Sequence, residues 1–96
     1  GDAIDGSRAY HHGLVNILCE PGEAIEVAVK LAERVNANAP LAVRATRKAI
    51  REGGVVSDEE GIRLAIEQFH PVASSEDAAE GPRAFVEKRP PEWKAR

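Results

Sequence analysis

Sulfur-containing and aromatic residues are scarce in this 96-residue sequence, which has one cysteine (Cys19), no methionine, one Trp, one Tyr and two Phe. A single cysteine cannot form an internal disulfide and offers no cysteine pair for zinc. Nothing therefore requires an oxidising compartment, and we expect a cytoplasmic protein. The lack of methionine in a chain that begins at Gly1 favours a fragment of a longer protein over a chain that has lost its initiator.

Long apolar runs and an excess of positive charge are also missing. The uninterrupted apolar runs are only a few residues long, as in residues 17–19, whereas about 20 are needed to span a bilayer. No basic segment followed by an apolar one opens the chain as a leader. The formal net charge is −3, and proteins that coat nucleic acid depend on many cations. We therefore expect neither a membrane nor a nucleic acid as partner.

Recognisable catalytic motifs are absent. The sequence has no GxSxG, no GxGxxG and no phosphate loop. His11, His12 and Cys19 form the one cluster of soft metal ligands, but adjacent histidines on a helix point about 100° apart, so we predict no metal site. Acidic residues gather where helices are predicted to start, and capping explains them: Asp58, Glu59, Glu60, Glu76 and Asp77. We expect no catalytic residue in this chain.

The apolar residues that are present predict a light core. They make up 43% of the chain, but 16 of them are alanine and only four are aromatic. A chain of this length buries only about 64% of its unfolded surface by folding alone. We therefore predict a domain that docks its apolar faces on something larger.

Hydrophobic spacing and capping signals predict an all-α fold, an irregular or orthogonal bundle of about four helices after one short N-terminal extended segment. The expected helices cover 2–12, 22–38, and 41–52 with Pro40 serving as the first turn. A further helix follows the capping box that starts at Ser57 and ends near Pro71, and the last begins after residues 74–77 (SSED) and runs to about Lys88. Pro82 should kink or restart that last helix. Residues 14–19 should form a short strand or an extended connector. We assign 1–20 to a junction with missing sequence, 21–88 to the helical domain, and 89–96 to a tail with an isolated Trp93.

Two predicted helix faces differ in character. One stripe (Ala24, Ala28, Leu31 and Val35) and the alanines at 42, 45 and 49 should be buried. Four cations share one side of the helix over 41–52: Arg44, Arg47, Lys48 and Arg51. Such a face could hold a phosphate, but a solvated face is the interpretation we favour.

Four stretches in this order and spacing resemble the C-terminal part of the enoyl-CoA hydratase/isomerase, or crotonase, superfamily. They are Arg8-Ala9 with 13–16 (GLVN); 31–34 (LAER) with 39–42 (APLA) and 48–50 (KAI); 75–77 (SED) with Glu80-Gly81; and 84–90 (AFVEKRP). The resemblance covers nearly the whole chain, and its closing motif is the most specific element.

The resemblance implies a helical region, detached from an α/β spiral core, that makes subunit contacts and helps to cover the ligand. The oxyanion hole and the two glutamates that handle water in the hydratases would lie upstream of residues 13–16. Phe69 and Lys88 match residues that contact the adenine and phosphate region of coenzyme A on a neighbouring subunit. The implied partners are the rest of the parent chain, neighbouring subunits in a homotrimer or hexamer, and acyl-CoA as substrate, with no cofactor.

We therefore interpret the chain as an assembly and ligand-covering module of a hydratase-like enzyme, inactive by itself. The alternative is a free-standing helical module that binds another protein through its alanine-rich face. A less favoured reading is an anion or nucleic-acid binder that uses the face from Arg44 to Arg51.

Overall fold

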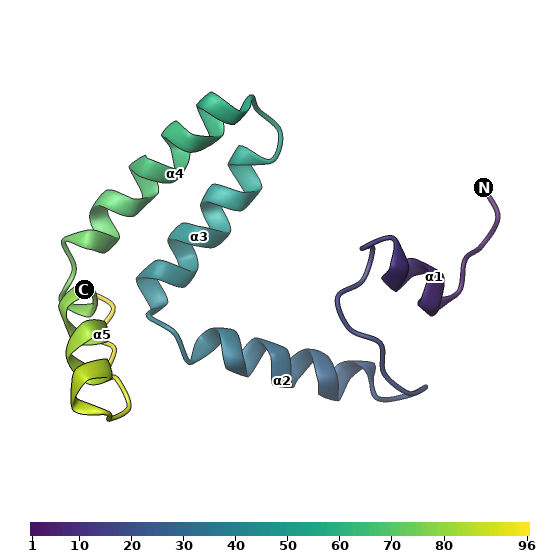
Figure 1. Cartoon of the computed structure of the whole chain (residues 1–96), viewed down its shortest axis with the longest axis horizontal. Coiled ribbons are helices and arrows are strands. Elements are labelled where there is room, and N and C mark those ends of the chain that lie inside the picture. The colour runs from purple at the N-terminus through teal and green to yellow at the C-terminus, as the bar shows by residue number, and fades with distance from the viewer. The chain divides into compact units, whose positions relative to one another are not determined.

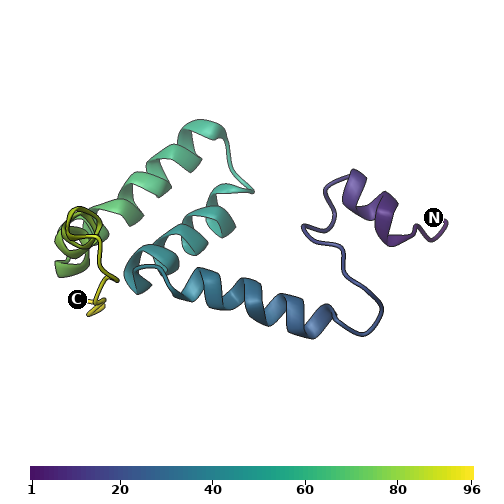
Figure 2. The ribbon, with the colours of Figure 1, turned by 60° about the horizontal axis from the view of Figure 1, so that its bottom comes forward.

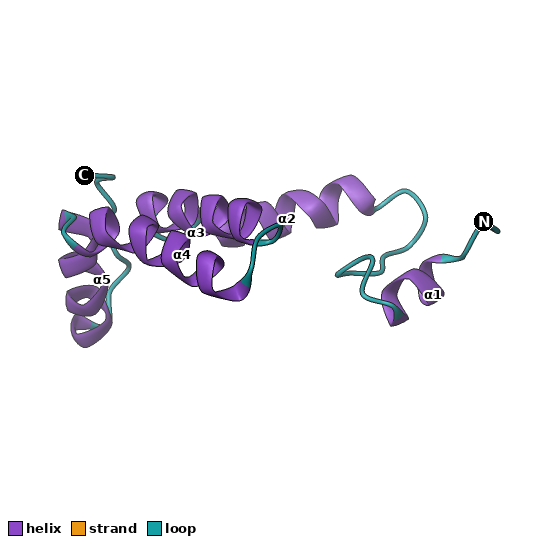
Figure 3. Cartoon of the chain, turned by 90° about the horizontal axis from the view of Figure 1, so that it is seen from above, coloured by secondary structure: helices purple, strands orange, loops and turns teal.

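Five helices and no strands form the secondary structure of the computed structural model, which describes all of residues 1–96 (Figures 1 and 3). This confirms the all-α prediction. The helices are α1 (Gly6–His11), α2 (Ala24–Asn36), α3 (Pro40–Gly53), α4 (Asp58–Ala73) and α5 (Glu76–Glu87). The chain divides into two compact units, Gly1–Glu33 and Arg34–Arg96. The assignment of 1–20, 21–88 and 89–96 to separate parts stays a prediction.

The first unit contains α1, a loop and most of α2. The Asp5 carboxylate caps α1 by accepting the Arg8 backbone N–H at 2.8 Å, so this helix starts later than the predicted residue 2. Gly13 follows it with a φ of +72°, a backbone conformation that favours glycine. Residues 14–19 form no strand. Of the two forms predicted for this segment, the strand is therefore wrong.

Helices α3 and α4 form an antiparallel hairpin, which is the main packing contact of the second unit (Figure 2). Pro40 is the first residue of α3, as predicted, since its missing N–H has no partner in a first turn. The backbones approach closely where the hairpin turns, because a Cβ added to Gly53 would lie 3.6 Å from the Gly61 Cα. Small residues thus set the spacing of the two helices.

Serine caps start both of the last two helices. The Ser57 hydroxyl accepts the Glu60 N–H at 3.4 Å, and the Ser75 hydroxyl accepts the Ala78 N–H at 3.2 Å. The Ser57 cap confirms the predicted start of α4. Helix α5 starts at Glu76, slightly earlier than predicted, because Ser75 caps it. The ends differ from prediction, because α4 continues through Pro71 to Ala73 and α5 passes Pro82 without a restart. Each proline removes one backbone hydrogen bond, and the remaining bonds keep each helix continuous.

The C-terminal residues 89–96 contact α5, and Trp93, isolated in the sequence, has partners in the fold. The Trp93 indole N–H donates to the Ala37 carbonyl at 2.9 Å, and the edge of its ring is 3.5 Å from the position of a Cβ built on Gly81. Asp77, on α5, accepts the backbone N–H groups of Lys94 at 2.7 Å and Ala95 at 3.1 Å. Its carboxylate therefore holds the tail rather than only capping a helix.

Little of the chain is buried. Ala84 and Asp77 are the only buried residues. On α2, the predicted apolar stripe is not covered within this chain, since Leu31 is 37% and Val35 45% exposed. The alanines at 42, 45 and 49 are half-buried, on α3. The light core is thus confirmed, with its apolar faces left open. None of the helices combines the length and the apolarity needed to cross a membrane.

The Asp77 contacts predict a fluorescence change. Asp77→Ala leaves two tail N–H groups without their acceptor, at a cost of about 1–3 kcal/mol, so the tail should detach and expose Trp93. Because Trp93 is the only tryptophan, its emission should shift to the red. Glu59→Ala is the matched control, since Glu59 holds the same second position in α4 and is exposed. An unshifted emission in Asp77→Ala would contradict the assignment.

Candidate functional site

Lys88 lies directly after the last residue of α5, at the point where the helix ends in a left-handed turn. Its φ is 53° and its ψ is 39°. Its N–H donates toward the carbonyls of Ala84 and Phe85, and the Arg89 N–H donates to the Ala84 carbonyl at 3.1 Å. This is the Schellman arrangement, in which the left-handed position is usually glycine. A lysine there costs about 1–2 kcal/mol of backbone strain.

Glu80 and Arg89 form a bidentate ion pair that closes this turn. The Arg89 guanidinium donates to the two Glu80 oxygens at 2.5 and 3.0 Å, and its Nε donates to Glu87 at 2.6 Å. Glu80 also accepts the Glu92 backbone N–H at 2.8 Å. The Arg89 hydrogen bonds, followed by the Glu92 N–H, lower the pKa of Glu80 to about 2. The same pairing raises the pKa of Arg89.

The Lys88 side chain is left free by these contacts. It is exposed and makes no ion pair or hydrogen bond through its ammonium group within the chain. Phe85, one helical turn earlier, is 84% exposed. A cation and an aromatic ring thus lie at neighbouring positions at one end of α5. Together they could contact an anionic group and a flat ring of one ligand.

Phe69 belongs to a different helix from Lys88 and Phe85. Phe69 lies on α4 and is 63% exposed, in line with Ile62 and Ile66, which are also exposed. Helix α5 leads away from the end of α4 (Figure 1), and its 12 residues span about 18 Å. The role of Phe69 stays a prediction, whereas Phe85, missed as a site residue, is the aromatic ring nearest Lys88 in sequence. The signal for Phe85 was its spacing of three residues from Lys88.

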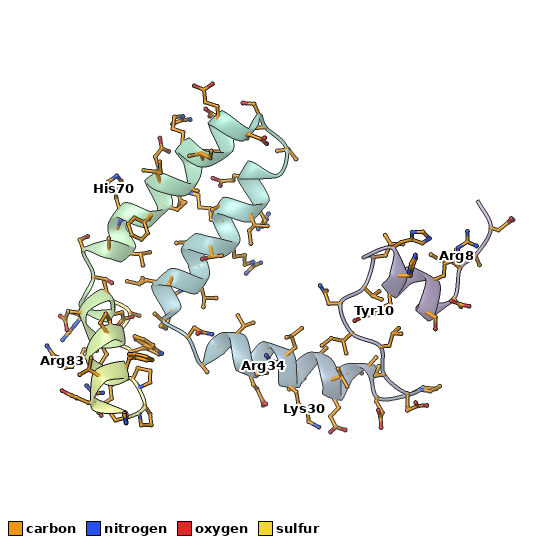
Figure 4. All side chains as sticks on the ribbon, in the orientation of Figure 1. Arg8, Tyr10, Lys30, Arg34, His70 and Arg83 are labelled. Carbon is orange, nitrogen blue, oxygen red and sulfur yellow. The ribbon has the colours of Figure 1, made fainter.

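The four cations of α3 line an open groove of about 790 Å³. The groove also contains Asn36, Asn38 and Glu52, and none of the four cations makes an ion pair. All four are exposed. Positive residues on α1, α2 and α5 are likewise spread over the surface, as Arg8, Arg34 and Arg83 show (Figure 4). The solvated face that we favoured for α3 accounts for this exposure.

The remaining polar candidates form no site. The rings of His11 and His12 stand edge to face with centroids 5.2 Å apart. Cys19 is an exposed free thiol. No group of three or more His, Cys, Asp or Glu side chains gathers anywhere in the chain in a way that could hold a metal ion. The end of α5 therefore stands out as the candidate site.

Comparison with known proteins identifies the family. A sequence model described as Enoyl-CoA hydratase/isomerase matches residues 1–96. The chain belongs to the enoyl-CoA hydratase/isomerase family. The resemblance seen in the motifs is thereby confirmed.

Individual relatives show which share of the family's length is represented. The chain is 39% identical over its whole length to the carnitinyl-CoA dehydratase of Proteus mirabilis and covers 38% of that protein. It is 38% identical to the enoyl-CoA hydratase EchA19 of Mycobacterium tuberculosis, of which it covers 36%. The crystal structure of an enoyl-CoA hydratase/isomerase from Mycobacterium paratuberculosis matches 97% of the chain with a TM-score of 0.88 and 48% identity, over 37% of that structure. The chain thus spans little more than one third of these family members.

The pairing of Glu80 with Arg89 predicts an unusual titration. Because the pKa of Glu80 falls from its ordinary 4.5 to about 2, the ion pair stabilises the turn fully above about pH 4.5. That contribution is lost as the pH falls from there toward 2. Carboxyl chemical shifts in NMR should show Glu80 titrating near pH 2, and Arg89→Gln should return it toward 4.5. Titration of Glu80 near 4.5 in the unaltered chain would show that the pair does not form.

Proposed function

We propose that this chain is the C-terminal helical region of an enoyl-CoA hydratase-like enzyme, where it serves subunit assembly and covers the acyl-CoA ligand. The observation that carries the proposal is the family match over all of residues 1–96, joined to a coverage of only 38% of a relative's length. The catalytic oxyanion hole and glutamates then belong to the other part of the parent enzyme. The match also favours this function over a free-standing interaction module.

The exposed apolar faces support an assembly role. Ile25 on α2 is 82% exposed and Ile62 on α4 is 62% exposed. On α4, Ile62, Ile66 and Phe69 recur at helical spacing and are all exposed. An uncovered apolar helix face of this kind marks an interaction site in soluble proteins. We assign these faces to contacts with the rest of the parent chain and with neighbouring subunits of a homotrimer or hexamer.

The end of α5 supports a ligand-covering role. Coenzyme A carries phosphates and an adenine ring, which are the groups that a free ammonium and an exposed aromatic ring bind. We assign Lys88 to a phosphate of acyl-CoA held by a neighbouring subunit. Phe85 is the ring favoured by its exposure and by its position three residues before Lys88, and Phe69 is the ring that the family resemblance favours.

The reaction class determines which small molecules the proposal requires, and the cysteine bears on the compartment. Addition of water across a carbon–carbon double bond involves no net oxidation or reduction. The proposal therefore requires acyl-CoA and water and no redox cofactor. An exposed free cysteine fits a reducing compartment, so we propose the cytoplasm.

Replacement of Lys88 tests the ligand-covering role. In the full-length enzyme, Lys88→Ala should raise the KM for enoyl-CoA about fivefold, equivalent to ~1 kcal/mol, with kcat nearly unchanged, because the contact is made equally in the ground and transition states. The effect should shrink at high salt. Lys30→Ala is the control, since Lys30 is an exposed lysine paired with Glu26. Hydration is measured by the loss of the absorbance of the α,β-unsaturated thioester. A full-length protein without hydratase activity would refute the proposed function.

A comparison of two phenylalanine variants decides which ring meets the ligand. Phe85→Ala should raise the KM for enoyl-CoA in a salt-independent way and leave the melting temperature unchanged, because Phe85 is 84% exposed in the chain. Phe69→Ala should leave the KM unchanged. The opposite pair of results would make the resemblance right and the geometric assignment wrong.

A further inference from the structure

The backbone of Lys88 has a left-handed conformation that favours glycine over lysine. Only two residues other than glycine adopt a positive φ in the chain, Lys88 and Ala95. Glycine or asparagine is the usual choice for a left-handed residue that ends a helix. A strained backbone that carries a chemically active side chain is a feature of functional positions. Since lysine does not favour this conformation by itself, the surrounding contacts must hold the turn.

Glu80 and Arg89 supply those contacts from both sides of the turn. Glu80 lies on α5 about two helical turns before Lys88, and its side chain is only 14% exposed. Arg89 follows Lys88 directly, so the two bonds to Glu80 bend the chain back at residue 88. The Glu92 N–H on the same carboxylate, at 2.8 Å, fastens the segment after the turn as well.

We propose that Glu80 and Arg89 are positioning residues for Lys88, and that their ion pair holds the left-handed turn from which the Lys88 ammonium group reaches the coenzyme A phosphate. This inference rests on the proposed function. Without the pair, residue 88 returns to the right-handed conformation, which continues the helix and turns the Cα–Cβ bond of Lys88 to another direction. Lysine has a flexible four-carbon stem, so a fixed Cβ limits the volume that its ammonium group samples.

Arginine is suited to this task in a way that lysine is not. A planar guanidinium makes two parallel bonds to one carboxylate and so fixes an orientation, whereas an ammonium group acts as a point charge. Arg89 uses its terminal nitrogens on Glu80 and its Nε on Glu87. Arg89→Lys therefore keeps the charge but loses the fixed geometry.

The test uses the full-length enzyme and two substrates, an enoyl-CoA and the corresponding enoyl-pantetheine, which has the same acyl group and lacks the nucleotide phosphates. Arg89→Gln should raise the KM for enoyl-CoA about threefold and leave the KM for enoyl-pantetheine and both kcat values unchanged. Arg89→Lys should give an intermediate rise. Arg63→Gln is the matched control, because Arg63 is also held between two glutamates, Glu60 and Glu67, but on α4.

A double variant separates positioning from general structural support. In a Lys88→Ala background, Arg89→Gln should change the KM for enoyl-CoA no further, since the side chain that it positions is gone. Equal KM increases for the two substrates, or the same threefold rise on top of Lys88→Ala, would overturn the inference. Glu80→Gln keeps the shape of the side chain and provides the same readout if Arg89→Gln fails to fold.

The controls also separate this inference from the function on which it rests. If Lys88→Ala raises the KM for enoyl-CoA and Arg89→Gln does not, the positioning role is wrong and the proposed function stands. If Lys88→Ala leaves the KM unchanged, the assignment of Lys88 to the phosphate fails, and the positioning role fails with it. Lys88→Gly provides a direct check on the turn. It should bind enoyl-CoA as weakly as Lys88→Ala does, and its melting temperature should be higher than that of Lys88→Ala, because glycine adopts the left-handed conformation without strain.

Discussion

The hydrogen bonds that the Asp77 carboxylate accepts are the interaction on which the arrangement of the C-terminal segment depends. Asp77 is one of two buried residues in a chain that has almost no apolar core, and it binds the backbone of residues that lie 17 and 18 positions later. A buried carboxylate is stable when backbone N–H groups solvate it as water would. Those two N–H groups fix residues 94 and 95. Trp93 directly precedes them, and it contacts Gly81 and the Ala37 carbonyl.

The C-terminal part therefore uses polar contacts where larger domains use apolar burial. The tail is joined to α5 by Asp77, by Glu80 with Arg89, and by the Glu76 N–H, which donates to the Arg96 carbonyl at 2.7 Å. The hairpin of α3 and α4 uses small residues instead, with Gly53 against Gly61. Both devices leave the larger apolar side chains on the outside. That distribution is the expected one for a region whose core is completed by other parts of an enzyme.

Features that depend on neighbouring residues could be predicted from the sequence. Ser57 marks a helix start by accepting a nearby N–H group, Pro40 marks one by its missing N–H, and both starts are confirmed. Interactions between distant residues could not be predicted in this way. The sequence alone carries no sign that Trp93 bonds to a carbonyl 56 residues earlier, or that Asp77 binds the tail. Lys88 was identified by its motif, but its left-handed backbone and the Glu80 and Arg89 pair depend on how the end of α5 folds back.

The chain carries one cysteine and one tryptophan, and the fold assigns them to different units. Cys19 is an exposed thiol in the unit Gly1–Glu33, and Trp93 is a half-buried indole in the unit Arg34–Arg96. A thiol-reactive dye therefore marks one unit, while the intrinsic emission of the indole reports on the other. Each unit can therefore be followed by its own spectroscopic signal in one sample, without a single engineered substitution.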